Sequence, residues 1–322
     1  MTRLHWSQQT IVAALTAVLF VFSALFVPGF LTGANLLGLV QAQATLGLLS
    51  LGMAVVVISR GIDLSMVSTV TVPPAIVLSM VQMGWSPVIA LLVGLMFSVG
   101  FGLLNGWLIA YVGLSAIFAT LATGLMIGGI GVGIFNFDVV VWPADLNGMS
   151  WIGRSAFLGV PMPLLAFLIA LVAVFIFLDR TRLGRFVYAM GDNLDAARSV
   201  GIPSRRVTLL LYVLSSLIAF ATGLIMAAML NSMSLRSSSA SVIYDIVLVV
   251  VVGGIGLSGG RGGASSVLVG TLLIGTFVNM MTLLDASYSI QSLIKGLLLL
   301  SAIILDSRLN PQNEETAQQG DI

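Results

Sequence analysis

The sequence predicts an all-α, polytopic membrane protein with about ten transmembrane helices. Of its 322 residues, 58% are hydrophobic and only 8% are charged, whereas about 25% are charged in an ordinary soluble domain. The stretch from Leu64 to Phe137 contains no charged residue, and at about 20 residues per bilayer crossing it alone accommodates about three spans. With a mean hydropathy of +1.12, the chain is neither a soluble globular protein nor a disordered one.

Ten apolar runs each predict one span. They are separated by Gly, Pro or charged residues and lie near 11–27, 37–58, 65–83, 87–111, 115–136, 157–178, 207–230, 242–257, 264–284 and 288–305. The first run follows Arg3 and also fits a signal peptide. Its length, the Pro28-Gly29 turn after it and the lack of a small-x-small cleavage site favour a retained span. The segments around Gly61 and Gly254 also fit half-helices or re-entrant turns.

The Arg residues predict the orientation of the chain. An even number of spans places both termini on one side, and ten Arg fall on that side, whereas only Arg154 and Arg236 fall opposite. Both termini are therefore expected in the cytoplasm, and the sole lysine, Lys295, falls in the last span. We expect one transmembrane domain over 1–322, with cytoplasmic segments at 1–10, 179–206 and 306–322. The ten Arg are Arg3, Arg60, Arg180, Arg182, Arg185, Arg198, Arg205, Arg206, Arg261 and Arg308.

Glycine spacing predicts close helix packing. The 35 Gly residues form the pairs Gly102-x3-Gly106, Gly124-x3-Gly128 and Gly129-x3-Gly133, and such small residues let helix backbones approach each other in lipid. Residues 61–65 (GIDLS) and 254–258 (GIGLS) are similar in sequence, and each follows a Val-rich run. This internal similarity indicates either a structural repeat or a chance resemblance.

Missing residue types exclude several classes of protein. The chain has no Cys, which removes disulfides, thiolate nucleophiles and Cys-ligated metals, and no metal site is expected. It has no Gly-Lys pair and hence no phosphate-binding loop, so any ATP must be hydrolysed by a partner. The net charge of +1 is too small to produce an electrostatic potential that would attract nucleic acid.

Two motifs resemble catalytic signatures in the wrong context. Residues 254–259 fit G-x-G-x-x-G, but residues 264–284 are uncharged and of membrane length, which does not suit a dinucleotide-binding fold. Ser258 lies in a G-x-S-x-G pattern that raises a remote alternative, an intramembrane serine protease. The only histidine, His5, precedes the first span, so Lys295 would have to be the base.

An ion-coupled secondary transporter is a stronger alternative. Charges at membrane depth are unfavourable and usually functional, and the candidates are Asp63, Asp245 and Lys295. The spans are otherwise almost free of charge, whereas such transporters gather several polar groups at the midplane. Capping or interfacial positioning explains Asp63 and Asp245 equally well.

The loop at 179–206 has the pattern of a short capped helix. Asp192 or Asn193 can cap its N-terminus, and Asp195 suits the first turn, where the helix dipole favours an anion. Gly201 suits the position after the helix, and Ile202-Pro203 ends it, so that the next long helix starts near 204.

The composition of this short helix suits a docking element. Ala196, Ala197 and Val200 predict a small apolar face, with Asp195, Arg198 and Arg205 supplying charge around it. A helix of this kind fits a groove on another protein. The alternative is a solvated connecting loop whose Arg residues follow the positive-inside rule.

Several motifs resemble those of permease subunits of ABC importers of the ribose, xylose and autoinducer-2 type. Residues 195–201 (DAARSVG) are similar to the E-A-A-x3-G loop that couples to the ATPase, and 181–193 (TRLGRFVYAMGDN) are similar to T-x-x-G-R-x-x-Y-A-x-G-x-N. Residues 61–65, 105–106 with 119–121, and 252–262 are similar to the family's G-I-D-L-S, N-G with A-T-L, and V-x-G-G-x-x-x-L-x-G-G-x-G. The resemblance covers about residues 35–305.

This resemblance implies a function and partners. The chain would be a multi-pass permease in the bacterial cytoplasmic membrane that translocates a sugar or sugar-like small polar solute by alternating access. Its partners would be a second permease chain in a homo- or heterodimer, an extracytoplasmic solute-binding protein and a cytoplasmic ATPase that binds ATP and Mg. The chain itself would hold no cofactor. The implied coupling residues are Asp192, Asn193, Asp195, Ala196, Ala197, Arg198, Val200 and Gly201.

Polar or aromatic residues within uncharged spans are candidates for the translocation pathway. Each can offer hydrogen bonds to a sugar, and each can equally bridge two helices. The chain departs from the family at 66–68 (MVS for V-G-S) and at 243–247 (IYDIV for E-L-D-A-I), so the substrate stays open. The pathway candidates are Gln41, Gln43, Asn105, Phe118, Thr120 and Asn279, and the candidate structural or gating turns are Gly61, Asp63, Ser65, Gly254, Gly259 and Gly260.

Overall fold

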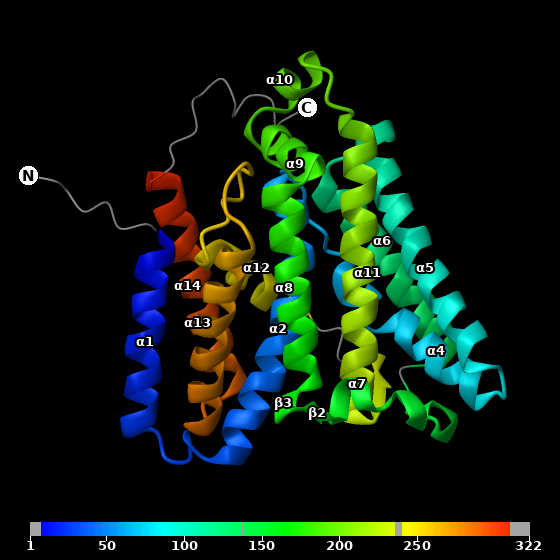
Figure 1. Ribbon diagram of the computed structural model, residues 1–322, viewed down its shortest axis with the longest axis vertical. Helices are drawn as coiled ribbons and strands as arrows, with labels where there is room; N and C mark the ends of the chain where they lie inside the picture. The colour runs from blue at the N-terminus through cyan, green and yellow to red at the C-terminus, as the bar shows by residue number, and fades with distance from the viewer. Residues whose placement is uncertain (1–7, 137, 236–239, 310–322) are drawn as a thin grey trace, which may run out of the picture.

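The computed structural model describes residues 8–136, 138–235 and 240–309 as a helical bundle (Figure 1). Within these ranges, seven helices are long and apolar enough to cross a membrane, and three predicted spans correspond to shorter apolar segments at 66–82, 242–252 and 288–304. The seven are α1 (Gln8–Phe26), α2 (Gly33–Ile58), α5 (Pro87–Trp107) with its π-helical extension η1 (Leu108–Val112), α6 (Ala116–Phe135), α8 (Met162–Arg180), α11 (Ser204–Leu230) and α13 (Ala264–Leu283). The all-α prediction is confirmed for the bundle.

At the three shorter segments, the structure differs from the predicted continuous spans in where the helices begin, break or end. The run at 65–83 divides into α3 (Met66–Thr69) and α4 (Val72–Gln82) because Pro73 and Pro74 cannot donate backbone hydrogen bonds to the preceding turn. The run at 242–257 ends early, since α12 (Ala240–Val252) stops at Gly253. The last run forms α14 (Tyr288–Leu309).

Two small β-ribbons lie outside the all-α prediction. β1 (Val139–Val141) pairs antiparallel with β4 (Ser232–Ser234), and β2 (Ala156–Phe157) pairs with β3 (Val160–Pro161). The second ribbon takes the start of the predicted span 157–178, so α8 begins at Met162. Near them lie η2 (Ala144–Met149), a 3₁₀ helix, and α7 (Trp151–Arg154), which packs on α8 and α11.

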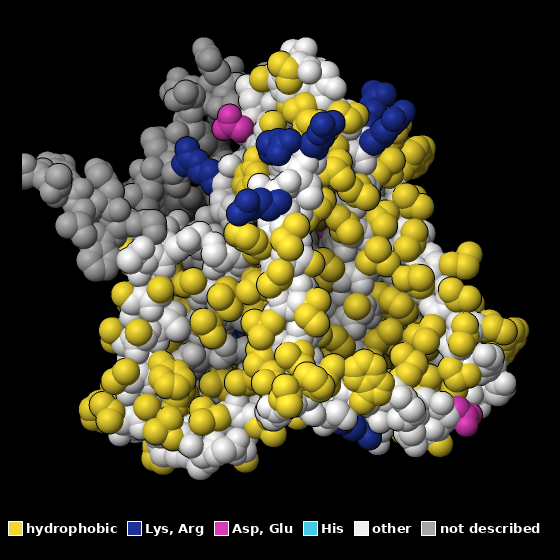
Figure 2. All heavy atoms as spheres, viewed as in Figure 1, with side chains coloured by type: hydrophobic (Ala, Val, Ile, Leu, Met, Phe, Trp, Pro, Cys, Tyr) yellow, Lys and Arg dark blue, Asp and Glu magenta, His cyan; other side chains and the backbone are white. Residues whose placement is uncertain are grey.

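α2 forms the centre of the bundle. It is buried along most of its length and packs against α8, α11, α12 and α13, while α1 packs on α13. By contrast, α1, α5, α6 and α8 expose many large apolar side chains, which form the wide hydrophobic belt in Figure 2. Such a belt suits lipid as the surrounding solvent.

Glycine allows the closest helix contacts. A Cβ on Gly102 would lie 2.8 Å from the Cα of Val213, and one on Gly106 would lie 2.7 Å from the Cα of Leu209, so α5 and α11 meet backbone to backbone. The prediction for this Gly pair is confirmed. Gly124 approaches the backbone of Ser65, but Gly129 and Gly133 have nothing within 4 Å of an added Cβ. Among the described residues, the last pair therefore makes no close helix contact, and the prediction fails there.

One end of the bundle is basic. α9 (Arg182–Asp192) and α10 (Leu194–Ser199) lie at this end, where Figure 2 shows most of the visible Lys and Arg side chains. The start of α1 and the end of α14 lie at the same end in Figure 1. Arg154 lies at the opposite end, where it binds the carbonyl oxygen of Ala228 and the side chain of Asn231. Arg3 and Arg236 lie outside the described residues.

Candidate functional site

α9 and α10 form a short hairpin at the basic end of the bundle. The Thr181 hydroxyl caps α9 by accepting a hydrogen bond from the Gly184 amide at 3.0 Å. On the inner side, Val187 and Met190 are buried, and the Tyr188 hydroxyl donates to the carbonyl oxygen of Gly262 at 2.8 Å. Burial, with a smaller effect of Asp179, raises the pKa of Tyr188 to about 12, so this donor stays protonated at neutral pH.

The predicted caps of the short helix are confirmed at both ends. The Asn193 side-chain oxygen accepts from the amides of Asp195 and Ala196 at 3.1 and 2.9 Å, so Asn193 and not Asp192 is the N-cap. At the other end the Gly201 amide donates to Arg198 and the Ile202 amide donates to Ala197, at 3.0 and 3.1 Å. With φ of +85° at Gly201, this is a Schellman motif.

The surface of α10 differs from the predicted apolar face. Ala197 is buried against the bundle, whereas Ala196 is exposed and Val200 is 77% exposed. The three residues therefore do not share one face, because the six-residue helix turns Ala197 toward the protein. The outer surface combines Ala196 and Val200 with an exposed ion pair between Asp195 and Arg198 at 3.5 Å, which adds little to stability.

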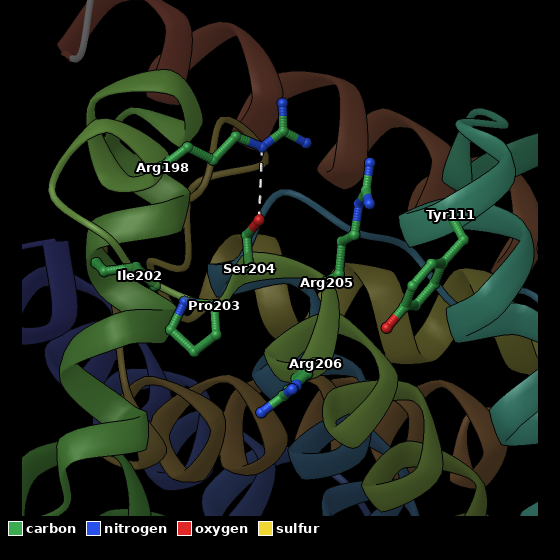
Figure 3. Close-up of a pocket in the computed structure, with 7 residues that line it drawn as sticks. All are labelled: Tyr111, Arg198, Ile202, Pro203, Ser204, Arg205 and Arg206. Carbon is green, nitrogen blue, oxygen red and sulfur yellow. Dashed lines mark hydrogen bonds between the residues drawn. The ribbon is translucent and has the colours of Figure 1, made fainter.

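A basic groove of about 730 Å³ lies beside α10 (Figure 3). The Arg205 guanidinium lies 5.4 Å from the centre of the Tyr111 ring, and Arg198 donates to the Ser204 hydroxyl at 3.4 Å. Three Arg residues with no acid among the lining residues produce a positive potential that favours a negatively charged partner. The lining residues are Tyr111, Arg198, Ile202, Pro203, Ser204, Arg205 and Arg206.

A second polar cluster is buried between four spans. Asp63, fully buried between α2 and α3, accepts from the hydroxyls of Ser65 and Ser215 at 2.5 and 2.6 Å. Asn105 on α5 donates to Ser65 at 2.8 Å and accepts from Thr123 on α6 at 2.5 Å. These bonds fix the chain between α2 and α3 against α5, α6 and α11.

A mostly apolar cavity of about 330 Å³ lies between α2, α11, α12 and α13. Its polar lining includes Gln43, Thr45, Asp245 and Asn279. Asn279 is engaged by Asn35, since the two side-chain amides exchange hydrogen bonds of 3.1 and 2.8 Å. The cavity has room for a small solute.

Asp245 also pairs with the only lysine. The Lys295 ammonium lies 2.8 and 2.9 Å from the two carboxylate oxygens of Asp245. The side chains are only 15% and 21% exposed, for Lys295 and Asp245 respectively, and they join α12 to α14. Within the described residues, no group of three or more His, Asp or Glu side chains is arranged to hold a metal ion.

Comparisons with known proteins identify the family of this chain. The model of the family described as "Branched-chain amino acid transport system / permease component" matches residues 35–303. The chain belongs to this family. It is a permease subunit of the ABC importer class, a multi-pass membrane protein of bacterial importers and not itself the catalytic subunit, so the resemblance seen in the sequence is confirmed.

The alignments with named relatives extend over almost the whole chain. The chain is 33% identical to the ribose import permease protein RbsC of Bacillus subtilis (strain 168) over 90% of both chains. It is 33% identical to the L-arabinose transport system permease protein AraH of Escherichia coli (strain K12), over 90% of this chain and 88% of that protein. For RbsC of Escherichia coli (strain K12), the identity is 31% over 95% and 96%. No solved structure matches the permease.

Family membership decides against the two alternative functions. The permease class does not require Ser258 as a nucleophile or Lys295 as a base, and Lys295 is bound by Asp245. The same ion pair joins α12 to α14, which accounts for Asp245 and Lys295 without invoking ion coupling.

The structure divides the predicted pathway residues into three groups. Gln43 and Asn279 line the cavity. Asn105 and Thr120 are fully buried, and the Thr120 hydroxyl accepts from the Leu64 amide at 3.1 Å, so these two residues hold helices together. Gln41 is half-buried and Phe118 is 72% exposed, and neither lines the cavity.

The predicted turn residues lie at two breaks in the helical bundle. The first break, residues 59–65, contains Gly61, Asp63 and Ser65, and the second break, residues 253–263, contains Gly254, Gly259 and Gly260. α2 and α12 both end in Schellman motifs, with Arg60 and Gly254 in the left-handed position. Gly61 and Gly254 align in the two similar sequences, but in the structure Gly254 occupies the left-handed position after its helix, whereas Gly61 lies one residue beyond it.

Sequence reasoning missed Arg60, Thr123 and Ser215. In the sequence, Arg60 contributes only to the charge count, because an Arg near the C-terminus of a helix is common and does not indicate that it occupies the left-handed position. Thr123 and Ser215 resemble many other hydroxyl residues in membrane helices, and no local pattern distinguishes them.

Proposed function

We propose that this permease imports a sugar or sugar-like small polar solute by alternating access, powered by ATP hydrolysis in a partner ATPase. The substrate class is supported by the ribose and arabinose permeases to which the chain is similar over about nine tenths of its length. The family description names branched-chain amino acids, whereas Gln43, Thr45 and Asn279 on the mostly apolar cavity wall supply side chains that can bond to the hydroxyl groups of a sugar.

The observation that carries the coupling role is the exposed, doubly capped helix α10 beside the basic groove. A rigid helix transmits force better than a loop, and its caps leave few free backbone groups at its ends. We propose that the cytoplasmic ATPase, with its ATP and Mg, receives Asp192, Asn193, Asp195, Ala196, Arg198, Val200 and Gly201, while Ala197 anchors the helix to the bundle.

The same proposal fixes the arrangement in the membrane. Ten crossings would place both termini and the α9–α10 hairpin in the cytoplasm, in agreement with the Arg-rich end of the bundle. A second permease chain would complete the pathway, and an extracytoplasmic solute-binding protein would deliver the solute to the opposite end. ATP-driven closure of the ATPases would then move α10 and repack the spans.

The test is a charge reversal on α10. Asp195→Arg should reduce the ATPase that is recovered with the tagged permease in mild detergent, because it breaks the Asp195–Arg198 ion pair and sets two like charges side by side on the outer surface of α10, without touching the membrane core. Asp145→Arg, an exposed acid on η2 far from α10, is the matched control. Equal ATPase recovery with parent and Asp195→Arg would remove Asp195 from the interface, and an ATPase-free permease in every sample would overturn the proposed function.

A further inference from the structure

Arg60 occupies a backbone position that favours glycine. It follows α2 with φ of +68°, and its amide donates to Val57 while the Gly61 amide donates to Val56, at 2.9 and 3.0 Å. This is the left-handed position of a Schellman motif, where a side chain is disfavoured. The next residue is Gly61, which is needed for a different reason, since a Cβ there would lie 2.7 Å from the Tyr212 hydroxyl. The side chain of Arg60 must therefore contribute something that glycine would not.

The guanidinium of Arg60 joins three segments that are far apart in the sequence. Its single Nε–H is shared as a bifurcated hydrogen bond between the carbonyl oxygens of Gly191 and Ser258, with N···O distances of 2.7 and 2.8 Å, and its Nη2 donates to the carbonyl oxygen of Asp192 at 2.6 Å. Gly191 and Asp192 end α9 and directly precede Asn193, the N-cap of α10. Ser258 belongs to the second break. Hydrogen bonds from a charged donor are about twice as strong as neutral ones.

The three segments also touch through their backbones. The Gly260 amide donates to the carbonyl oxygen of Ile58 at 2.8 Å. A Cβ on Gly191 would overlap the Ile58 carbonyl, and one on Gly259 would lie 2.6 Å from Cγ of Arg60. Because no side chain separates these backbones, the three segments pack directly on one another, and the Arg60 guanidinium adds hydrogen bonds from the first break to the other two segments.

We call this contact between Arg60, the end of α9 and the second break the junction. It connects α10 to both breaks. The first break continues from Arg60 to Asp63, whose hydrogen bonds hold α11 through Ser215. The second break connects α12 to α13, and α12 contributes Asp245 to the cavity wall. A movement of the α9–α10 hairpin can therefore reach both the buried polar cluster and the cavity through one side chain.

We propose that Arg60 is a positioning residue that transmits the movement of the α9–α10 hairpin to the two breaks, and so couples ATP hydrolysis to solute movement. The proposal rests on the proposed function, in which the ATPase acts on α10. Arg60 binds the backbone carbonyl oxygen of Asp192 but would itself touch neither the ATPase nor the solute. Its role would be to hold three carbonyl oxygens with one rigid fork, which the flexible ammonium of lysine does not reproduce.

The decisive variant is Arg60→Gly. It removes the guanidinium while relieving the backbone, so the turn itself should still form. We expect normal recovery of the permease and ATPase, and a fall of at least roughly tenfold in solute imported per ATP hydrolysed, because losing even one charge-assisted hydrogen bond corresponds to about that factor. Arg60→Lys should fall between the parent and the glycine variant. Arg182→Ala, an exposed Arg at the start of α9, is the control and should import normally.

A second measurement separates this proposal from the proposed function. Hydrogen–deuterium exchange on the purified permease alone should become faster at 182–201 and at 253–263 in Arg60→Gly, and should not change in Arg182→Ala. Unchanged exchange would show that Arg60 does not hold the segments together. Faster exchange with normal import per ATP would show that it holds them but does not couple them. Failure of the parent to recruit an ATPase would overturn the proposed function while leaving the exchange result as evidence for the junction.

Discussion

At the level of single residues, the two ends of α10 follow directly from local chemistry. Asn193 accepts two amide hydrogen bonds, and Gly201 adopts a left-handed backbone, as expected for an N-cap and for the residue after a helix. Both could be predicted because each depends on neighbours within four positions. Arg60 could not, since its acceptors Gly191 and Ser258 lie 131 and 198 positions away.

Gly201 provides a residue-level prediction. Gly201→Val should impair ATP-dependent uptake, because a residue with a Cβ in the left-handed region loses about 1–2 kcal/mol. No atom of the described residues lies within 4 Å of the added Cβ, so backbone strain is the direct change expected there. Gly201→Asn should be nearly neutral, since Asn tolerates this conformation. Uptake in vesicles at equal permease levels measures both variants, and normal uptake by Gly201→Val would contradict the role of this helix end.

Asn193 permits a matched test of the other end of α10. Asn193→Ala removes the acceptor for both capping amides and should destabilise the helix by about 1 kcal/mol, whereas Asn193→Asp keeps an acceptor and should retain most of the helix. Hydrogen–deuterium exchange at 194–199 would measure the difference. If both variants exchange like the parent, packing of Ala197 and not the cap holds α10 in place.

At the level of elements, apolar length predicted where helices lie but not where they break. The segment Phe157-Leu158-Gly159-Val160-Pro161 is apolar and falls at the start of the predicted span 157–178. It belongs instead to the β2–β3 hairpin, in which Leu158 and Gly159 both have positive φ, as a type I′ turn requires. Hydrophobicity alone does not show this, since membrane helices also contain Gly and Pro. The glycine pair on α5 was predictable because its spacing places both residues on one helix face.

The α5–α11 contact gives an element-level prediction. Gly102→Ala should lower the melting temperature of the permease in detergent, because the added Cβ would lie 2.8 Å from Val213 Cα and 2.9 Å from the Tyr212 carbonyl oxygen, both of them backbone atoms. Gly100→Ala, two residues earlier on the same helix, has nothing within 4 Å and should have little effect or raise stability slightly. Equal melting temperatures for the two variants would show that α5 and α11 can move apart without a measurable loss of stability.

At the level of the whole molecule, the pathway is the part that the sequence predicted least well. Gln43 and Asn279 line the cavity, but Asn105 and Thr120 bridge helices instead. Polar residues in uncharged spans serve both purposes, and only the tertiary arrangement separates them. The family could be recognised because its motifs lie in order along the chain, whereas the cavity combines residues of α2, α11, α12 and α13 that have no fixed spacing.

The Asp245–Lys295 pair provides the prediction that tests how the whole molecule is powered. Removing one partner, as in Asp245→Asn or Lys295→Gln, leaves a poorly solvated charge and should destabilise the permease by about 3–5 kcal/mol, whereas the neutral double variant should recover most of that loss. If the pair serves only to join α12 to α14, the double variant should also transport. Thermal melting and uptake of the two single variants and the double variant measure this cycle. A double variant that folds like the parent but no longer transports would give the pair a direct part in solute movement, and parental uptake that follows an ion gradient without ATP would extend that part to ion coupling.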